Sequence, residues 1–217
     1  MKSLFLFLAL FIASMSVCSA HDAMEVSPYK TTAAQTSVTN FTEDQWDVQF
    51  NYDGQAATGF LGNAGAEFTG TNFYTTRWNR NMMVRWNADG TIRDSMALSG
   101  YTGTTGIRDL AWDGEFLYGG IAVTNQIAVI DTGTMSVVAT ITCPGAATVR
   151  SIAYDASLDG FWVSNWADAL TCVSREGIAL ATISTTLAAK YGSAYDPFTP
   201  GGPFLWVWDQ GAGQGNP

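Results

Sequence analysis

One aromatic position recurs along this chain at a constant interval of 44 residues. It is occupied by Tyr74, Tyr118, Trp162 and Trp206. Each of these residues is the second member of a short apolar run, as in Leu117-Tyr118-Gly119-Gly120. Strand-built repeats with a period of roughly 40–50 residues are typical of propeller-like arrays. The period therefore constrains the fold more than any other feature of the sequence.

Within the second repeat unit, four strand patterns follow one another. They cover residues 107–112, 116–121, 126–131 and 137–142. Alternating apolar residues, β-branched side chains and turn pairs such as Asp113-Gly114 predict strands joined by tight turns. Four strands in one unit correspond to one propeller blade. A solenoid and a sandwich are the alternative all-β folds, and a sandwich does not predict a strict period.

The same pattern divides residues 41–217 into a partial β-propeller. It places blades near 65–100, 106–143 and 149–185, and half a blade at 192–217. The first unit starts at Phe68-Thr69-Gly70, and residues 46–52 alternate as one further strand. No helical periodicity follows the first 20 residues. Because propellers close with roughly four to eight blades, we expect the natural product to be longer and this chain to be its N-terminal fragment.

The first 20 residues have the pattern of a secretory signal peptide. Lys2 precedes an apolar run at 4–12, and small residues end at Cys18-Ser19-Ala20. The run is shorter than a membrane span of about 20 residues. We expect cleavage after Ala20, a mobile segment at 21–40, no membrane span in the mature chain, and a secreted or cell-surface location. An anchor helix and acylation of Cys18 are the alternatives, and Val17 disfavours acylation.

The charge balance limits the partners of the mature chain. Without Lys2, 9 basic residues stand against 19 acidic ones. Such an excess of negative charge repels phosphate backbones, so we expect no nucleic-acid partner. An extracellular glycan or protein is the expected partner.

Several motifs in residues 41–217 resemble those of a family. They are Asp47-Val48-Gln49-Phe50, Gly65-Ala66-Glu67-Phe68, Tyr74-Thr75-Thr76-Arg77-Trp78, Arg108-Asp109-Leu110-Ala111, Arg150-Ser151-Ile152-Ala153-Tyr154-Asp155, Phe161-Trp162-Val163-Ser164-Asn165-Trp166, Tyr191-Gly192-Ser193-Ala194-Tyr195-Asp196 and Asp209-Gln210-Gly211-Ala212-Gly213. Together they resemble large secreted bacterial propeller-repeat proteins that carry a C-terminal sorting domain for type IX secretion. The resemblance implies an uncharacterised surface or extracellular protein. It also implies that the sorting domain and any adhesion modules follow residue 217.

Metal and nucleophile chemistry has few candidate residues. The single histidine, His21, excludes sites that need two histidines, and a catalytic triad would have to use this terminal residue. Cys143 and Cys172, the two cysteines of the mature chain, are candidates for a disulfide or for two buried thiols. We expect no cofactor. The acidic turns at 87–90 and 131–133 are candidate Ca²⁺ ligands, although such residues usually shape turns.

The candidate ligand-binding residues lie near strand ends. Arg108 and Arg150 recur near the start of first strands, which line the channel of a propeller. These arginines could face a ligand or donate to carbonyl groups of a neighbouring blade, and we favour the second role. Trp78 follows Arg77, and Trp166 follows Asn165, at matching ends of second strands. These aromatic residues could stack on a ligand or pack between blades, and we favour packing.

These patterns predict a non-enzymatic secreted interaction protein with a propeller scaffold. An extracellular enzyme of the polysaccharide lyase or cyclotransferase type is the alternative, because propellers host both kinds of function. A catalyst needs an acid and a base that break the repeat, and the sequence shows no obvious pair of this kind.

Overall fold

The computed structural model describes residue 48 and residues 50–212. The expected signal peptide, the segment 21–40 and His21 lie outside these residues, as do Trp46 and Asp47. Within the described part of the chain, no helix has the length and apolar character needed to span a bilayer.

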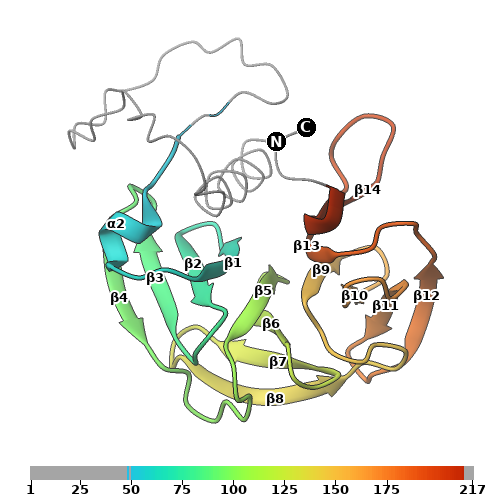
Figure 1. Cartoon of the computed structure of the whole chain (residues 1–217), viewed down its shortest axis with the longest axis horizontal. Coiled ribbons are helices and arrows are strands. Elements are labelled where there is room, and N and C mark those ends of the chain that lie inside the picture. Colours follow the sequence, from blue (N-terminus) through green and yellow to red (C-terminus); the bar gives the residue numbers. More distant parts are fainter. Residues whose placement is uncertain (1–47, 49, 213–217) are drawn as a thin grey trace.

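Antiparallel sheets follow one another along the chain as successive blades (Figure 1). The first blade contains β1 (Asn63–Phe68), β2 (Asn72–Arg77), β3 (Met83–Asn87) and β4 (Ile92–Met96). The second contains β5 (Ile107–Trp112), β6 (Leu117–Ile121), β7 (Gln126–Asp131) and β8 (Ser136–Thr142). The third contains β9 (Ser151–Asp155), β10 (Gly160–Ser164), β11 (Leu170–Ser174) and β12 (Ala179–Ile183). The fourth sheet pairs β13 (Lys190–Asp196) with β14 (Phe204–Asp209).

The first strand of each sheet faces the centre of the molecule. Figure 1 shows β1, β5, β9 and β13 around the middle, with β4, β8 and β12 at the rim. Strands within each complete blade are neighbours in chain order, which is the meander of a propeller blade. The prediction of an all-β, propeller-like array of four-stranded blades is confirmed.

The recurring aromatic position belongs to the core of each blade. Tyr118 is 2% exposed, and its hydroxyl donates to Asp113 Oδ2 at 2.7 Å. The equivalent bonds are Trp162 Nε1 to Asp155 Oδ2 at 3.0 Å and Trp206 Nε1 to Asp196 Oδ2 at 3.2 Å. Asp155 and Asp196 end their first strands, and Asp113 directly follows its own; each also accepts turn amides, as Asp113 does from Glu115 and Phe116. One aromatic–aspartate pair therefore fixes the hairpin between the first two strands of three successive sheets.

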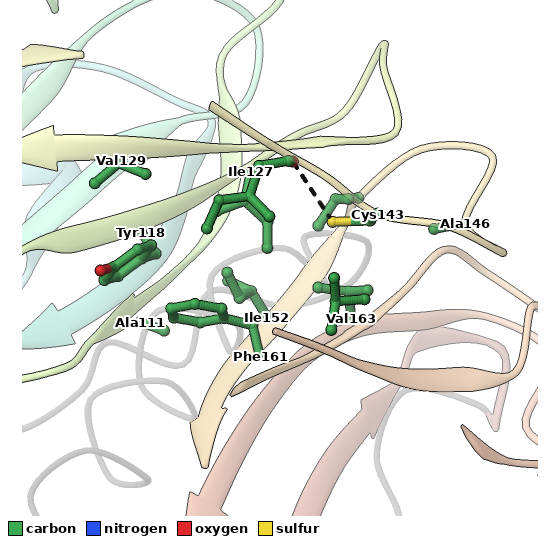
Figure 2. Close-up of a cluster of buried hydrophobic side chains, with 12 residues drawn as sticks. Ala111, Tyr118, Ile127, Val129, Cys143, Ala146, Ile152, Phe161 and Val163 are labelled. Atoms are coloured by element: carbon green, nitrogen blue, oxygen red, sulfur yellow. Dashed lines mark hydrogen bonds between the residues drawn. The ribbon is translucent and has the colours of Figure 1, made fainter. Parts of the chain in front are cut away.

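Apolar side chains fill the space between neighbouring blades. Figure 2 shows the cluster between the second and third blades, where the rings of Tyr118 and Phe161 lie 4.2 Å apart. Cys143 is buried in this cluster, whereas Cys172 packs in a different one with Trp162. Both cysteines are free. Of the two alternatives for these residues, the structure therefore has the buried thiols and not the disulfide.

The first blade begins differently from its prediction. Residues 50–52 are not in a strand; instead the rings of Phe50 and Tyr52 pack against Phe73. The first strand ends at Phe68 instead of starting there, because Thr69 already turns the chain toward Asn72. The short helix α2 (Gly54–Thr58) was not predicted, since five residues are too few to show a helical period.

Candidate binding site

Five side chains from four different sheets form an arginine–aromatic cluster. Its members are Trp78, Arg108, Arg150, Trp166 and Tyr191. They lie where the first strand of a sheet begins and the second strand ends. Four of the five were predicted as ligand-binding candidates, and the structure brings them together.

Trp78 is held beside Arg108 by a close approach of two chain segments. The Trp78 carbonyl accepts the Gly106 N–H at 3.0 Å. A Cβ on Gly106 would lie 1.5 Å from the Arg77 carbonyl oxygen, so only glycine permits this approach. Arg108 follows two residues later, and its guanidinium lies 5.0 Å from the Trp78 ring. The glycine before β5 thus places the Arg108 guanidinium over the Trp78 ring.

Trp166 occupies the equivalent position in the third blade, just after the second strand, β10. Its carbonyl accepts the Lys190 N–H at 3.1 Å, and its ring lies 5.8 Å from the Tyr191 ring. The Arg150 guanidinium lies 4.7 Å from the Trp166 ring, and its Nε donates to Asn165 Oδ1 at 2.8 Å. Trp166 has a φ of 45°, which is unusual for a bulky residue and costs backbone energy.

A single hydrogen bond joins the two halves of the cluster. Arg108 Nη1, from the second blade, donates to the Tyr191 hydroxyl of the fourth sheet at 2.6 Å. The two residues are 83 positions apart in the sequence. The arginine–aromatic cluster therefore spans the inner strands of several sheets at one end of the molecule. Tyr191 was not predicted as a site residue, because no local pattern reveals a contact across the axis.

The two arginines of the cluster have no carboxylate partner among the described residues. The ion pairs found there are Arg85–Asp94, Arg175–Asp113 and Arg175–Asp159. Burial lowers the pKa of Arg150, and the positive charge of Arg108 lowers it further. Arg108 Nε is buried without a hydrogen-bond partner in this part of the chain. The cluster consequently holds uncompensated positive charge.

The sequence pattern favoured hydrogen bonds from Arg108 and Arg150 to carbonyl groups of a neighbouring blade. Within the described residues, both guanidinium groups instead donate to side chains. Trp78 and Trp166 are 43% and 36% exposed, so neither is fully packed between blades.

Arg77 has a different role from the cluster arginines. It is 5% exposed, its Nη2 donates to the Leu61 carbonyl at 2.7 Å, and its guanidinium lies 4.5 Å from the Phe60 ring. Burial lowers its pKa, as does the nearby charge of Arg80. Arg77 therefore supports the loop that precedes β1, whereas Asn165 lies within the site as a partner of Arg150.

Charged residues are separated between the two ends of the blades. The basic end, where first strands begin and second strands end, carries Arg77, Arg80, Arg108, Arg150 and Lys190, together with the carboxylates of Asp168 and Asp209. The acidic end, at the opposite turns, carries Asp89, Asp113, Glu115, Asp131, Asp155, Asp159, Glu176 and Asp196, together with Arg93 and Arg175. The arginine–aromatic cluster is thus a positive surface on a negatively charged protein.

Two carboxyl groups with raised pKa values lie on the inner strands, the buried Asp109 and the partly buried Glu67, and neither was predicted as a site residue. Asp109 is 2% exposed and accepts the N–H groups of Leu110, Ile152 and Ser193 at 3.1, 2.8 and 3.1 Å. Burial raises its pKa to about 8, although the three N–H groups favour the charged form. The Asp109 carboxyl therefore ties together the inner strands of three sheets.

Glu67 is the second of these groups. It accepts the Phe68 N–H at 2.9 Å, and burial raises its pKa well above the ordinary value, with a further contribution from the charge of Asp109. Glu67 pairs with Tyr74 across β1 and β2, at the position where Ala111 and Ala153 stand in the next two blades. Aligning the repeats would have revealed this carboxylate, because it replaces alanine.

Among the described residues, no three histidine, cysteine or acidic residues gather in a way that would hold a metal ion. In the turns predicted as Ca²⁺ ligands, Asp89 accepts the Thr91 N–H at 2.9 Å and Asp131 accepts the Gly133 N–H at 2.7 Å. These carboxylates therefore shape their turns, and Ca²⁺ binding stays a prediction.

No family model matches the sequence, and no curated protein matches it. Among solved structures, the Myxococcus xanthus glutaminyl cyclase is similar with a TM-score of 0.52 at 10% identity, over 67% of this chain and 66% of that one. A streptogramin B lyase (TM-score 0.49, 16% identity) matches over 69% of this chain and 49% of its own. The WD40 repeats of RRP9 (TM-score 0.49, 13% identity) match over 62% and 42%. The chain spans between about two fifths and two thirds of the length of these structures, and at such identities the likeness concerns the fold alone.

Proposed function

We propose that this chain is a secreted or cell-surface interaction protein that binds an extracellular ligand at the arginine–aromatic cluster. The observation that carries the proposal is the stacking of two half-exposed tryptophans on two arginines that have no carboxylate partner within residues 50–212. Tryptophan, tyrosine and arginine dominate the energetics of binding surfaces because they combine a large contact area with directed polar groups.

The rigidity of the cluster also supports a role in binding. Trp78 and Trp166 are each tied by their carbonyl groups to the start of a following sheet. Arg108 is fixed by Tyr191, and Arg150 is fixed by Asn165. Side chains that are already ordered lose little conformational entropy when a ligand binds. The strained backbone of Trp166 fits the same interpretation, because such strain concentrates at functional positions.

The proposed export rests on the N-terminal sequence. Lys2, the apolar run at 4–12 and the small residues ending at Ala20 favour a cleaved signal peptide and a secreted protein. The resemblance to proteins with a type IX sorting domain makes the bacterial cell surface the proposed destination. Expression of the full chain in a bacterium, followed by N-terminal sequencing of the exported product, should give His21 as the first residue.

A binding screen tests the proposed function directly. The purified chain is applied to an array of extracellular glycans and surface proteins, and hits are measured by calorimetry. Replacement of Trp166 by alanine should weaken binding about tenfold or more, since it removes a central aromatic contact. Phe198→Ala is the matched control, because Phe198 is 61% exposed on the opposite turns, and this change should leave the affinity unaltered. Absence of binding by the unmodified chain in the whole screen would contradict the proposal.

An extracellular enzyme is the second candidate, and Glu67 is the observation that favours it. This carboxyl breaks the repeat, is only partly buried and has a raised pKa, as a general acid requires. Asp109 is a poor partner in catalysis, because both of its oxygens accept backbone N–H groups. Assays of polysaccharide cleavage and of glutaminyl cyclisation, repeated with Glu67→Gln, test this candidate: activity that disappears in the variant would favour the enzyme.

A further inference from the structure

We infer that the arginine–aromatic cluster recognises an acidic polysaccharide, that is, a glycan whose sugars carry carboxylate or sulfate groups. The inference rests on the proposed function and narrows its ligand to one class. The aromatic rings would stack on sugar rings, and the guanidinium groups would bind the acidic substituents.

The first step of the argument is the missing counter-charge. The chain has 19 acidic residues against 10 basic ones, yet neither Arg108 nor Arg150 has an acidic partner among the described residues. The charge of Arg108 lowers the pKa of Arg150, so the two cations repel each other in the free protein. An anion placed between them would relieve this repulsion and would form charge-assisted hydrogen bonds.

The second step is the free hydrogen-bonding capacity. Arg108 Nε is buried without a partner among the described residues, and a buried donor without a partner costs free energy. Each guanidinium has one hydrogen bond to a side chain there, Arg108 to Tyr191 and Arg150 to Asn165, which holds its plane in place. The Nη1 and Nη2 groups of Arg150, together with Nη2 of Arg108, remain as donors for a carboxylate or a sulfate.

The third step concerns the spacing of rings and charges. Trp78, Arg108, Tyr191, Trp166 and Arg150 follow one another, and the distances between neighbours are 5.0, 5.8, 5.8 and 4.7 Å. Each guanidinium therefore lies over a tryptophan ring, and the Tyr191 ring contacts both of these pairs. A polymer whose units each combine an apolar ring face with an acidic group is complementary to this pairing of ring and charge.

Nucleic acid fits the arginine–aromatic cluster less well. Duplex DNA carries about one charge per 1.7 Å, and its binding normally requires many phosphate contacts. Two arginines on a protein with a formal net charge of −9 cannot neutralise such a density. The negative charges of the acidic end lie on the opposite turns of the blades. Salt screens their repulsion of a ligand at the cluster, because the Debye length is about 10 Å at 0.1 M ionic strength. A glycan with at most one or two charges per sugar is therefore the better match.

The experiment compares four probes on the full chain by calorimetry at low and moderate salt. They are an oligogalacturonate, a sulfated galactan oligomer, a neutral galactan oligomer of the same length, and a poly-glutamate peptide. We expect at least one acidic oligosaccharide to bind about tenfold or more tightly than the neutral one, with an affinity that falls as salt rises. The carboxylate and sulfate arms identify which acidic group is recognised.

Substitutions test whether the preference for acidic over neutral oligosaccharides comes from the arginine–aromatic cluster. Arg150→Gln should weaken binding of the acidic oligosaccharide about tenfold or more, since it removes a charge-assisted hydrogen bond. Arg150→Lys keeps the charge but loses the planar fork, so an intermediate loss is expected. Arg93→Gln is the matched control: it removes the same charge from β4, outside the cluster, and should leave the affinity unchanged. Thermal unfolding curves confirm that each variant is folded.

Four results would overturn the inference. Equal affinity for neutral and acidic oligosaccharides would refute the anion preference while leaving the proposed function intact. Tighter binding of poly-glutamate would indicate an acidic protein partner instead. An unchanged affinity in Arg150→Gln would place the acidic ligand elsewhere on the surface. If no ligand of any class bound to the chain, the proposed function would fail together with the inference.

Discussion

Arginine has opposite surroundings at the two ends of the blades. At the acidic end, Arg175 Nη1 lies 2.7 Å from Asp113 Oδ2, and Nη2 lies 2.8 Å from Asp159 Oδ1. Hydrogen bonds, first to Asp159, raise the pKa of Arg175 above its ordinary value. At the basic end, burial lowers the pKa of Arg150, and its hydrogen bond runs to the neutral Asn165.

This difference separates structure from function. Arg175 belongs to the third blade, and its bonds to Asp113 and the Tyr118 hydroxyl fasten that blade to the second. In the described part of the chain, Arg108 Nε has no hydrogen-bond partner, and both Arg108 and Arg150 stack on partly exposed tryptophans. Substitutions at the acidic end should therefore reduce stability, whereas substitutions at the basic end should reduce ligand binding.

The largest loss of stability is expected for Asp113→Ala. Asp113 accepts two turn N–H groups, the Tyr118 hydroxyl and Arg175, and its side chain is 4% exposed. Its removal leaves these donors without their acceptor, and we expect a loss of about 3 kcal/mol in the free energy of unfolding. Urea denaturation measures this value. Arg150→Gln is the control from the basic end, with an expected change below about 1 kcal/mol; a loss as large as that of Asp113→Ala would remove the distinction between the ends.

Asp109, on the inner strands, should give the next largest effect. Asp109→Ala removes the acceptor of three backbone N–H groups on the inner strands. We expect a loss of about 2 kcal/mol at neutral pH, again measured by urea denaturation. If the loss is below about 0.5 kcal/mol, the carboxyl does not tie the three sheets together.

The same variant should alter the pH dependence of stability. The pKa of Asp109 is about 8 in the folded protein and near its ordinary value when unfolded, so the folded state binds the extra proton between about pH 4 and pH 8. The contribution of this group is fully present below about pH 4 and is lost as the pH rises through 8. Carboxylates with lowered pKa, such as Asp113 and Asp159, act oppositely and lose their contribution in acid. Asp109→Ala should show a flatter decline in stability between pH 5 and pH 8.

The repeat pattern accounts for most of what could be predicted from the sequence. The 44-residue period at Tyr118 and Trp162 predicted four-stranded blades, and the residues 107–112 and 126–131 have the bounds of β5 and β7. Such strands are visible because alternation and turn residues are local features. The ends of second strands, with Trp78 and Trp166, were predicted by comparing units at the same position of the period.

Contacts between distant units could not be predicted in this way. The Arg108–Tyr191 bond joins residues 83 positions apart, and the Arg175–Asp113 pair joins residues 62 apart. A periodic sequence shows that positions are equivalent, but it does not show which side chains meet across the axis. Asp109 and Glu67 were overlooked for a different reason, because each occupies a small-residue position in one unit only.

Tyr118→Phe tests the acidic end with a smaller change. The ring stays in its cluster against Phe161, while the hydroxyl bonds to Asp113 and Arg175 are lost. We expect a loss of about 1 kcal/mol, which is the usual net value of a hydrogen bond. The midpoint of urea unfolding should shift without a change in slope. A loss above about 3 kcal/mol would instead indicate that the ring packing depends on the hydroxyl.

Trp166→Asn should have the smallest effect on stability, although it removes the centre of the proposed binding site. The tryptophan has a φ of 45°, and this left-handed conformation costs about 1–3 kcal/mol for such a residue but little for asparagine. The contacts of its ring with Arg150 and Tyr191 contribute a similar amount, about 1–2 kcal/mol together. The two terms oppose each other, so the free energy of unfolding should change by less than about 1 kcal/mol while ligand affinity falls. A loss of stability of more than about 2 kcal/mol would show that Trp166 serves packing between sheets, and the contrast between the two ends would then be one of degree.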